Sequence, residues 1–150
     1  MADYFEDFEV GAKQLTATAQ VSEKAILDFA RAFDPQPMHT DIQAAKNGPF
    51  HGLIASGWHT AALVMRLIAE ARPFGDAQVL GLGVDELRWP HPVRPGDTIQ
   101  SEMEIVAKRA SESNPNYGII GVRVTTRNQK GEVVMTHSPA CWVRRRPSNT

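Results

Sequence analysis

The stretch GLIASGWHTAALVMRLIAEA, residues 52–71, is the longest segment of the chain with a helical pattern. Its apolar residues cover nearly every face of a helix, and Arg66 and Glu70 carry its only charges. A helix that is apolar all round is a buried helix. The stretch therefore predicts a central helix from Gly52 to Ala71, around which the rest of the chain packs.

The segments before this helix predict one strand and one further helix. Lys13–Val21 alternates weakly between polar and apolar residues, which favours a strand. Glu23–Phe33 has apolar residues at helical spacing, and Ser22 stands where its side chain can cap the first turn. The first third of the chain is therefore expected to run from strand to helix.

Two prolines interrupt the chain after that helix. Pro35 and Pro37 lack backbone donors, and each disfavours a helical residue before it. We therefore expect Asp34–Met38 to form a stiff, extended loop. A short helix is expected next over Ile42–Lys46, capped by Asp41 or by the threonine before it.

After residue 71 the pattern changes from helix to strand. Asn128-Gln129-Lys130-Gly131 is typical of a hairpin turn between two of the strands. The expected strands are Val79–Trp89, Thr98–Arg109, Tyr117–Arg127 and Glu132–Arg145. One central helix with an antiparallel sheet around it is an α+β architecture. The length of 150 residues favours a single domain over 1–150.

The composition is that of an ordinary globular protein. Hydrophobic residues make up 42%, charged residues 22%, and the formal net charge is −1, which favours neither a nucleic-acid partner nor a membrane surface. The single cysteine, Cys141, has no partner for an internal disulfide. The start of the sequence lacks the pattern of a signal peptide, and the longest uncharged stretch contains Gly, Pro and His. We therefore expect a cytoplasmic protein.

Asp34 and His39 are the first candidates for chemistry. They stand five residues apart, and the expected loop between them allows both side chains to reach one small volume. A carboxylate beside an imidazole is a usable acid–base pair near neutral pH. The alternative is structural, because Asp34 can cap the loop and His39 can cap the next helix. The spacing alone leaves both interpretations open.

Ser56 and Gly57 lie early in the expected central helix. Glycine inside a helix costs roughly 1 kcal/mol relative to alanine, so a reason to keep it is needed. One reason is the close approach of a ligand, since N–H groups at a helix start bind an oxyanion. The other reason is tight packing of the helix on the sheet, and the sequence does not decide between them.

No metal or nucleotide cofactor is expected. His51 and His59 lie near the candidate pair in sequence, but their spacing matches no metal-binding pattern, and Cys141 stands alone. The only closely spaced glycine pair, Gly81 and Gly83, belongs to an expected strand and does not open a helix. It therefore lacks the context of a phosphate-binding loop.

Two stretches taken together resemble a known family. Phe33–Asp41, followed by Gly52–Gly57, resembles the MaoC-like dehydratases and (R)-specific enoyl-CoA hydratases. Their motif runs Asp, any residue, Asn, Pro, Leu, His, and a downstream apolar helix carries a glycine near its start. Val93–Asp97 is similar to their connection between two strands. The resemblance extends from about residue 10 to residue 145.

The resemblance implies a hot-dog fold, in which an antiparallel sheet wraps a long central helix, and a homodimer with sites near its interface. It implies that Asp34 and His39 activate one water, and that the Gly57 backbone N–H polarises a thioester carbonyl. The implied reaction converts an enoyl-thioester to a 3-hydroxyacyl thioester. The carrier is coenzyme A or an acyl carrier protein, and the thioester is the substrate, with no other cofactor.

The sequence departs from the family pattern at three positions. Gln36 stands for the Asn, Phe33 for the Gly that usually precedes the Asp, and Met65 for a Ser that some members carry. These changes bear on substrate fit and on the orientation of His39. Ser56 is a candidate replacement for the lost polar contact.

Two other functions compete with hydration. A hot-dog thioesterase usually needs a carboxylate on or facing the central helix, and residues 52–65 contain none. A non-catalytic module that binds acyl-thioesters has no need of Asp34 together with His39. If coenzyme A is the carrier, the candidates for its phosphates are Arg94, Lys46 and the run Arg144–Arg146.

Overall fold

The structure, a computed structural model, describes residues 4–148, so the first three residues of the acidic N-terminal segment lie outside it. A short 3-10 helix, η1, precedes five strands and four α-helices. Their bounds are η1 Phe5–Asp7, β1 Lys13–Gln20, α1 Glu23–Phe33, α2 Pro37–Thr40, α3 Ile42–Lys46, α4 Gly57–Ala71, β2 Val79–Arg88, β3 Thr98–Ala110, β4 Tyr117–Arg127 and β5 Val133–Arg144.

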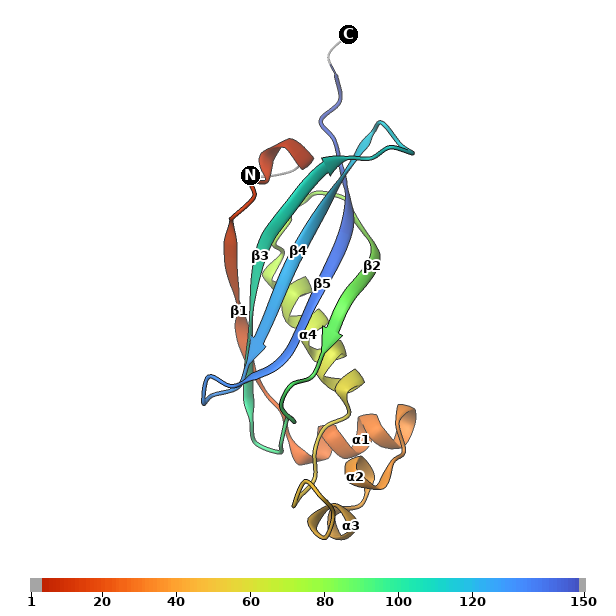
Figure 1. Cartoon of the computed structure of the whole chain (residues 1–150), viewed down its shortest axis with the longest axis vertical. Coiled ribbons are helices and arrows are strands. Elements are labelled where there is room, and N and C mark those ends of the chain that lie inside the picture. Colours follow the sequence, from red (N-terminus) through yellow and green to blue (C-terminus); the bar gives the residue numbers. More distant parts are fainter. Residues whose placement is uncertain (1–3, 149–150) are drawn as a thin grey trace.

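The strands form one antiparallel sheet in the order β1-β3-β4-β5-β2. Helix α4 lies along one face of this sheet and packs mainly against β1 and β3 (Figure 1). The three shorter helices gather at the end where α4 begins (Figure 1). A long helix against a curved antiparallel sheet is the hot-dog arrangement, so the expected α+β fold is confirmed.

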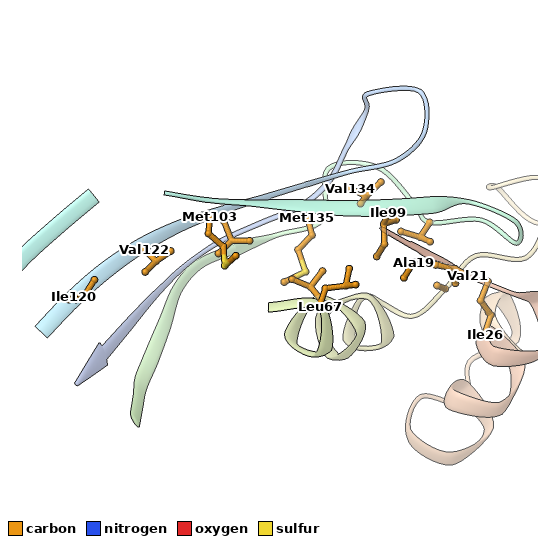
Figure 2. Packing of buried hydrophobic residues seen from close by; sticks show 14 of the residues in the cluster. Ala19, Val21, Ile26, Leu67, Ile99, Met103, Ile120, Val122, Val134 and Met135 are labelled. Atoms are coloured by element: carbon orange, nitrogen blue, oxygen red, sulfur yellow. The ribbon is translucent and has the colours of Figure 1, made fainter. Parts of the chain in front are cut away.

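The core lies between α4 and the sheet. Along β4, buried and partly buried residues alternate, because successive side chains of a strand point to opposite faces. Leu67 of α4 points toward Met135 of β5, and both are fully or almost fully buried (Figure 2). This packing fixes the position of α4 on the sheet.

Most of the expected boundaries are confirmed to within two residues. Ser22 caps α1 by accepting from Ala25 N at 3.1 Å, and Asp41 caps α3 by accepting from Ala44 N at 3.0 Å. The hairpin turn is also present, with Gly131 at φ 78. These boundaries are therefore marked by strong signals in the local sequence.

The central helix begins at Gly57, five residues later than the sequence predicts. Residues 52–56 are non-helical. Ile54 N donates to Met38 O at 3.2 Å, and Ala55 N donates to Val93 O at 2.8 Å. Long-range pairing of the backbone therefore replaces the first helical turns, and Ser56 becomes the N-cap of α4.

The prediction that the central helix is buried all round is wrong for this chain. Thr60, Val64 and Leu67 are buried against the sheet. On other faces of α4, Trp58 is 60% exposed and Met65 is 57% exposed. The helix is apolar on faces that its own sheet does not cover.

The expected extended loop over Asp34–Met38 is also shorter than predicted. Helix α2 begins at Pro37 and holds His39 in its single turn. Proline suits the first position of a helix, because its fixed φ is helical and its missing N–H has no partner there anyway. The second proline therefore starts a helix at a position where the sequence predicts an extended loop.

Candidate active site

The structure brings Asp34 and His39 together. Asp34 caps the C-terminus of α1, and His39 lies on α2. Their closest atoms, Asp34 Oδ2 and His39 Nε2, are 3.5 Å apart. The side chains are only 18% and 8% exposed, respectively. The expected convergence of the two groups on one small volume is therefore present.

A backbone carbonyl fixes the tautomer of His39. His39 Nδ1 lies 2.7 Å from Ile54 O, and a carbonyl oxygen only accepts hydrogen bonds, so Nδ1 carries the proton. In the neutral ring, Nε2 then keeps its lone pair. That lone pair is on the side of the ring that approaches the Asp34 carboxylate.

Two side chains hold the Asp34 carboxylate. Ser56 Oγ donates to Oδ2 at 2.6 Å, and Gln36 Nε2 donates to Oδ1 at 2.6 Å. The bond from Ser56 first, then the bond from Gln36, lower the pKa of Asp34 below its ordinary value, and the nearby His39 adds to this. Asp34 is therefore an ionised carboxylate at neutral pH.

Ser56 and Gly57 form the start of α4, beside the pair. Ser56 is fully buried and caps the helix by accepting from Trp58 N at 3.3 Å. The N–H groups of a first helical turn have no partner within the helix. In α4, the N–H groups of Trp58, His59 and Thr60 donate to Ser56, so the N–H of Gly57 is the donor of this turn that is left to consider beside the pair.

Gly57 also has a packing role that the sequence left open. A β-carbon at this position would lie 2.5 Å from the ring of Trp89, which follows β2. Trp89 in turn meets Trp58 edge-on, with ring centroids 5.3 Å apart. The indole of Trp89 lies against the start of α4, so any side chain at Gly57 must displace it.

The other two histidines near the pair in sequence do not join it. His59 stacks on Phe29 of α1, with ring centroids 4.9 Å apart. Burial lowers the pKa of His59. His51 is exposed. Within residues 4–148, no three His, Cys, Asp or Glu side chains are grouped so that they could hold a metal ion.

Most of the candidate phosphate-binding cations have other contacts. Arg94 donates to Phe50 O at 2.7 Å and so braces the segment before α4. In the C-terminal run, Arg145 lies 3.2 Å from Glu6 and Arg146 lies 2.5 Å from Asp7, both near η1. The run is thus tied to the N-terminal segment, whereas Lys46 is exposed at the end of α3.

Three contributors to this site were not assigned a role from the sequence. Gln36 was noted only as a departure from the motif, yet it holds Asp34. The carbonyl of Ile54 gives no sequence signal, because every residue has one. Trp89 lies about thirty residues beyond Gly57 in the chain, and nothing local predicts their contact.

The fold and the geometry together define a candidate acid–base site in a hot-dog protein. A carboxylate and an imidazole lie at the start of the central helix, near the N–H of Gly57. None of the helices within residues 4–148 has the length and apolar character needed to span a bilayer.

Comparison with known proteins places the chain in a family. The model of the MaoC like domain matches residues 7–128, which is most of the sequence. The chain belongs to the MaoC-like domain family. It resembles the uncharacterized protein YdeM of Bacillus subtilis, with 34% identity over 125 residues that cover 83% of this chain and 87% of that protein.

Proteins with assigned reactions are also similar. A 3-hydroxybutyryl-CoA dehydratase of Methylorubrum extorquens is 30% identical over 68% of this chain and 63% of its own length. Among solved structures, the MaoC-like dehydratase from Rhodospirillum rubrum has a TM-score of 0.89 and 42% identity, covering 97% of this chain and 99% of that one. The R-hydratase PhaJ1 from Pseudomonas aeruginosa has a TM-score of 0.77 and 25% identity, covering 98% and 95%. This chain is therefore related to hydratases and dehydratases.

Proposed function

We propose that this protein adds water across the double bond of an enoyl-thioester such as enoyl-CoA, with Asp34 and His39 acting on one water. The observation that carries the proposal is the 3.5 Å separation of Asp34 Oδ2 and His39 Nε2. Asp34 Oδ2 and a His39 Nε2 that carries no proton are both acceptors, so they do not bond directly to each other. A water molecule placed beside the two atoms, within hydrogen-bond distance of each, is the group on which we expect the pair to act.

The reaction follows from that arrangement. The water oxygen forms a bond to the β-carbon of the enoyl group, while one water proton passes to the Asp34–His39 pair. The π electrons of the double bond form a new C–H bond at the α-carbon, which receives a proton from the pair. The product is a 3-hydroxyacyl thioester, and the pair returns to its starting protonation.

The start of α4 supplies the second part of the mechanism. Negative charge develops on the thioester oxygen as water adds to the conjugated double bond. The N–H of Gly57 is a donor in the first turn of α4, where the helix dipole also favours negative charge. We assign to Gly57 the binding of this oxygen, and to Ser56 the positioning of Asp34.

A homodimer is part of the proposal. The sheet has two edge strands, β1 and β2, and on β2 the apolar residues Leu80, Leu82 and Val84 are exposed. Trp58 and Met65 of α4 are exposed as well. Unpaired edges and large apolar surfaces of a folded chain favour association. A second copy that pairs along β2 covers that edge, and a symmetric pair closes the assembly.

Thioester hydrolysis remains the strongest competitor, because one observation favours it. Helix α4 carries no carboxylate in its first half, but Asp34 comes from α1 to face its N-cap. A carboxylate at that point can also direct water at a thioester carbon. Hydration and hydrolysis therefore have to be separated by their products.

Incubation with crotonyl-CoA separates the candidate functions. The proposal predicts loss of the enoyl absorbance without release of free thiol. Release of free thiol at the same rate as the loss of enoyl absorbance would identify a thioesterase. Binding of the thioester without either change would identify a non-catalytic module. Both of the last two results contradict the proposal.

A further inference from the structure

A groove of about 1020 Å³ lies beside the C-terminal half of α4, apart from the Asp34–His39 pair. Strands β2 to β5 form its other side. Its walls include Met65 and Ile68 of α4, Met103 of β3 and Val122 of β4. A concave, largely apolar surface of this size is suited to a hydrocarbon chain.

One buried polar side chain in this groove has a ring nitrogen that the fold does not use. His137 of β5 lines the groove and is only 4% exposed. Within the part of the chain that the structure describes, its Nδ1 has no hydrogen-bond partner. Buried polar atoms are normally paired, and an unpaired one destabilises the fold. His137 is therefore positioned for a partner that the folded chain itself does not supply.

The chemistry of His137 limits what that partner is. Burial, together with the nearby positive charge of Arg123, lowers the pKa of His137, so the ring is neutral at neutral pH. A neutral imidazole has one donor and one acceptor nitrogen. A hydroxyl group donates and accepts, so it matches either tautomer.

The groove lies at a defined distance from the start of α4. Met65, the first residue of α4 to line it, is eight positions beyond Gly57, which is about 12 Å along a helix axis. A four-carbon acyl group held at Gly57 ends well before the groove, whereas a medium-length chain extends into it. Gly81 of β2, opposite Cys141, leaves open space where a side chain would stand.

We propose that this groove takes the acyl chain of a medium-length substrate, and that His137 recognises a hydroxyl group near the far end of that chain. The inference rests on the proposed hydratase function for the position of the thioester. His137 is thus a residue that determines which chain is preferred, and it takes no part in the addition of water.

The test compares three CoA thioesters in the wild type and in His137→Leu. They are crotonyl-CoA, a ten-carbon enoyl-CoA that ends in a methyl group, and the same chain with a terminal hydroxyl. We expect the ratio of kcat/KM for the hydroxylated over the methyl-ended chain to fall about tenfold in the variant, the loss of one buried hydrogen bond. Turnover of crotonyl-CoA should stay unchanged, because that chain does not reach His137.

Two further variants make the result specific. His137→Asn keeps a donor and an acceptor and should restore part of the preference. His91→Leu, which removes an exposed histidine outside the groove, should leave the ratio as in the wild type. An unchanged ratio in His137→Leu overturns the inference. An equal loss for all three substrates also overturns it, because His137 would then act on the fold or on the chemistry.

Calorimetry with the saturated ten-carbon thioesters separates this inference from the proposed function. If the wild type fails to hydrate crotonyl-CoA, the proposed function is contradicted. If that same protein binds the hydroxylated chain about tenfold more tightly than the methyl-ended chain, and His137→Leu abolishes the difference, the groove assignment stands by itself. Equal binding of both chains by the wild type contradicts it.

Discussion

The hydroxyl of Ser56 donates to Asp34 Oδ2 over 2.6 Å, joining two residues that lie 22 positions apart. The same oxygen accepts from Trp58 N and so caps α4. One buried side chain therefore links the start of the central helix to the carboxylate of the candidate pair. The position of Asp34 is fixed by the helix against which the substrate is expected to bind.

Ser56→Ala is expected to move the acid limb of the pH profile. The hydrogen bond from Ser56 is the largest cause that holds the pKa of Asp34 below its ordinary value. Without that bond the pKa rises, so the active carboxylate is protonated at a higher pH. The acid limb of kcat/KM should therefore shift upward, as a pH series with crotonyl-CoA measures.

The matched control is Ser22→Ala. Ser22 caps α1 by accepting a hydrogen bond from Ala25 N, and it plays no part in holding Asp34. Each variant removes one helix cap, at a cost of about 0.5–2 kcal/mol. Thermal unfolding should show both losses, but only Ser56→Ala should shift the profile. Identical profiles in the wild type and Ser56→Ala would show that Asp34 does not set the acid limb.

Gly57→Ala should destabilise the protein through Trp89. The added carbon would stand 2.5 Å from the indole ring, and overpacking of this kind costs about 1–3 kcal/mol. Trp89→Ala removes the obstacle, so the two substitutions together should cost less than the sum of the single ones. Urea unfolding of all three variants measures this coupling.

Turnover of the same variants tests the proposed role of Gly57. If the thioester approaches the helix at this glycine, the double variant regains stability but stays slow. Gly83→Ala is the control for unfolding, because a carbon added there meets nothing within 4 Å. Full activity of the Gly57→Ala/Trp89→Ala protein would mean that the glycine serves packing alone.

Leu80→Glu is expected to separate the proposed dimer. Leu80 is exposed on β2, one of the two edge strands, and it does not line the groove. Two copies paired along β2 would bring the two new carboxylates close together, and like charges oppose such pairing. Light scattering at micromolar concentration should give a dimer for the wild type and a monomer for the variant.

The control for assembly is Val106→Glu. Val106 is also an exposed apolar residue, but it lies on β3 within the sheet. This variant should keep the mass of the wild type. A monomeric wild type would contradict the assembly and leave the exposed apolar face of α4 without an explanation.

The stability of the protein should fall as the pH falls from neutrality toward about 5.5, above the ordinary range for carboxylates. Burial lowers the pKa of both His59 and His137 in the folded protein. The unfolded chain, with ordinary pKa values, therefore takes up protons first. Stability that is present above the ordinary histidine pKa is lost as the pH falls below it.

Urea unfolding at the two pH values measures this loss. His59→Phe, which keeps a ring against Phe29, should reduce the difference between them. His91→Phe, at an exposed position, should leave it unchanged. A wild type equally stable at both pH values would show that neither buried ring titrates differently on folding.

The sequence predicted the fold where its signals are local. The caps at Ser22 and Asp41 and the glycine at position 131 mark boundaries that the structure confirms. The start of α4 was wrong, because the backbone of residues 54 and 55 pairs with Met38 and Val93. Propensity is overridden there by partners that are distant in sequence or belong to another element.

The candidate site also combines features that the local sequence predicts with features that depend on long-range packing. The closeness of Asp34 and His39 follows from a spacing of five residues and two prolines, although the route runs through a short helix instead of a loop. The bond from Ser56 depends on how α1 docks beside α4, and the contact of Gly57 with Trp89 depends on the sheet. Such contacts arise only from packing, which one sequence does not display.

The most direct test of the proposed function is the rate of crotonyl-CoA hydration in Asp34→Asn, in His39→Ala and in the protein with both changes. A positioned proton-transfer group contributes roughly 10²–10⁴-fold to a rate, so each single variant should lose turnover by about that factor. Because both groups act on one water, the double variant should be little slower than either single one. A single variant that is folded and hydrates crotonyl-CoA at nearly the wild-type rate would contradict the assignment of the pair.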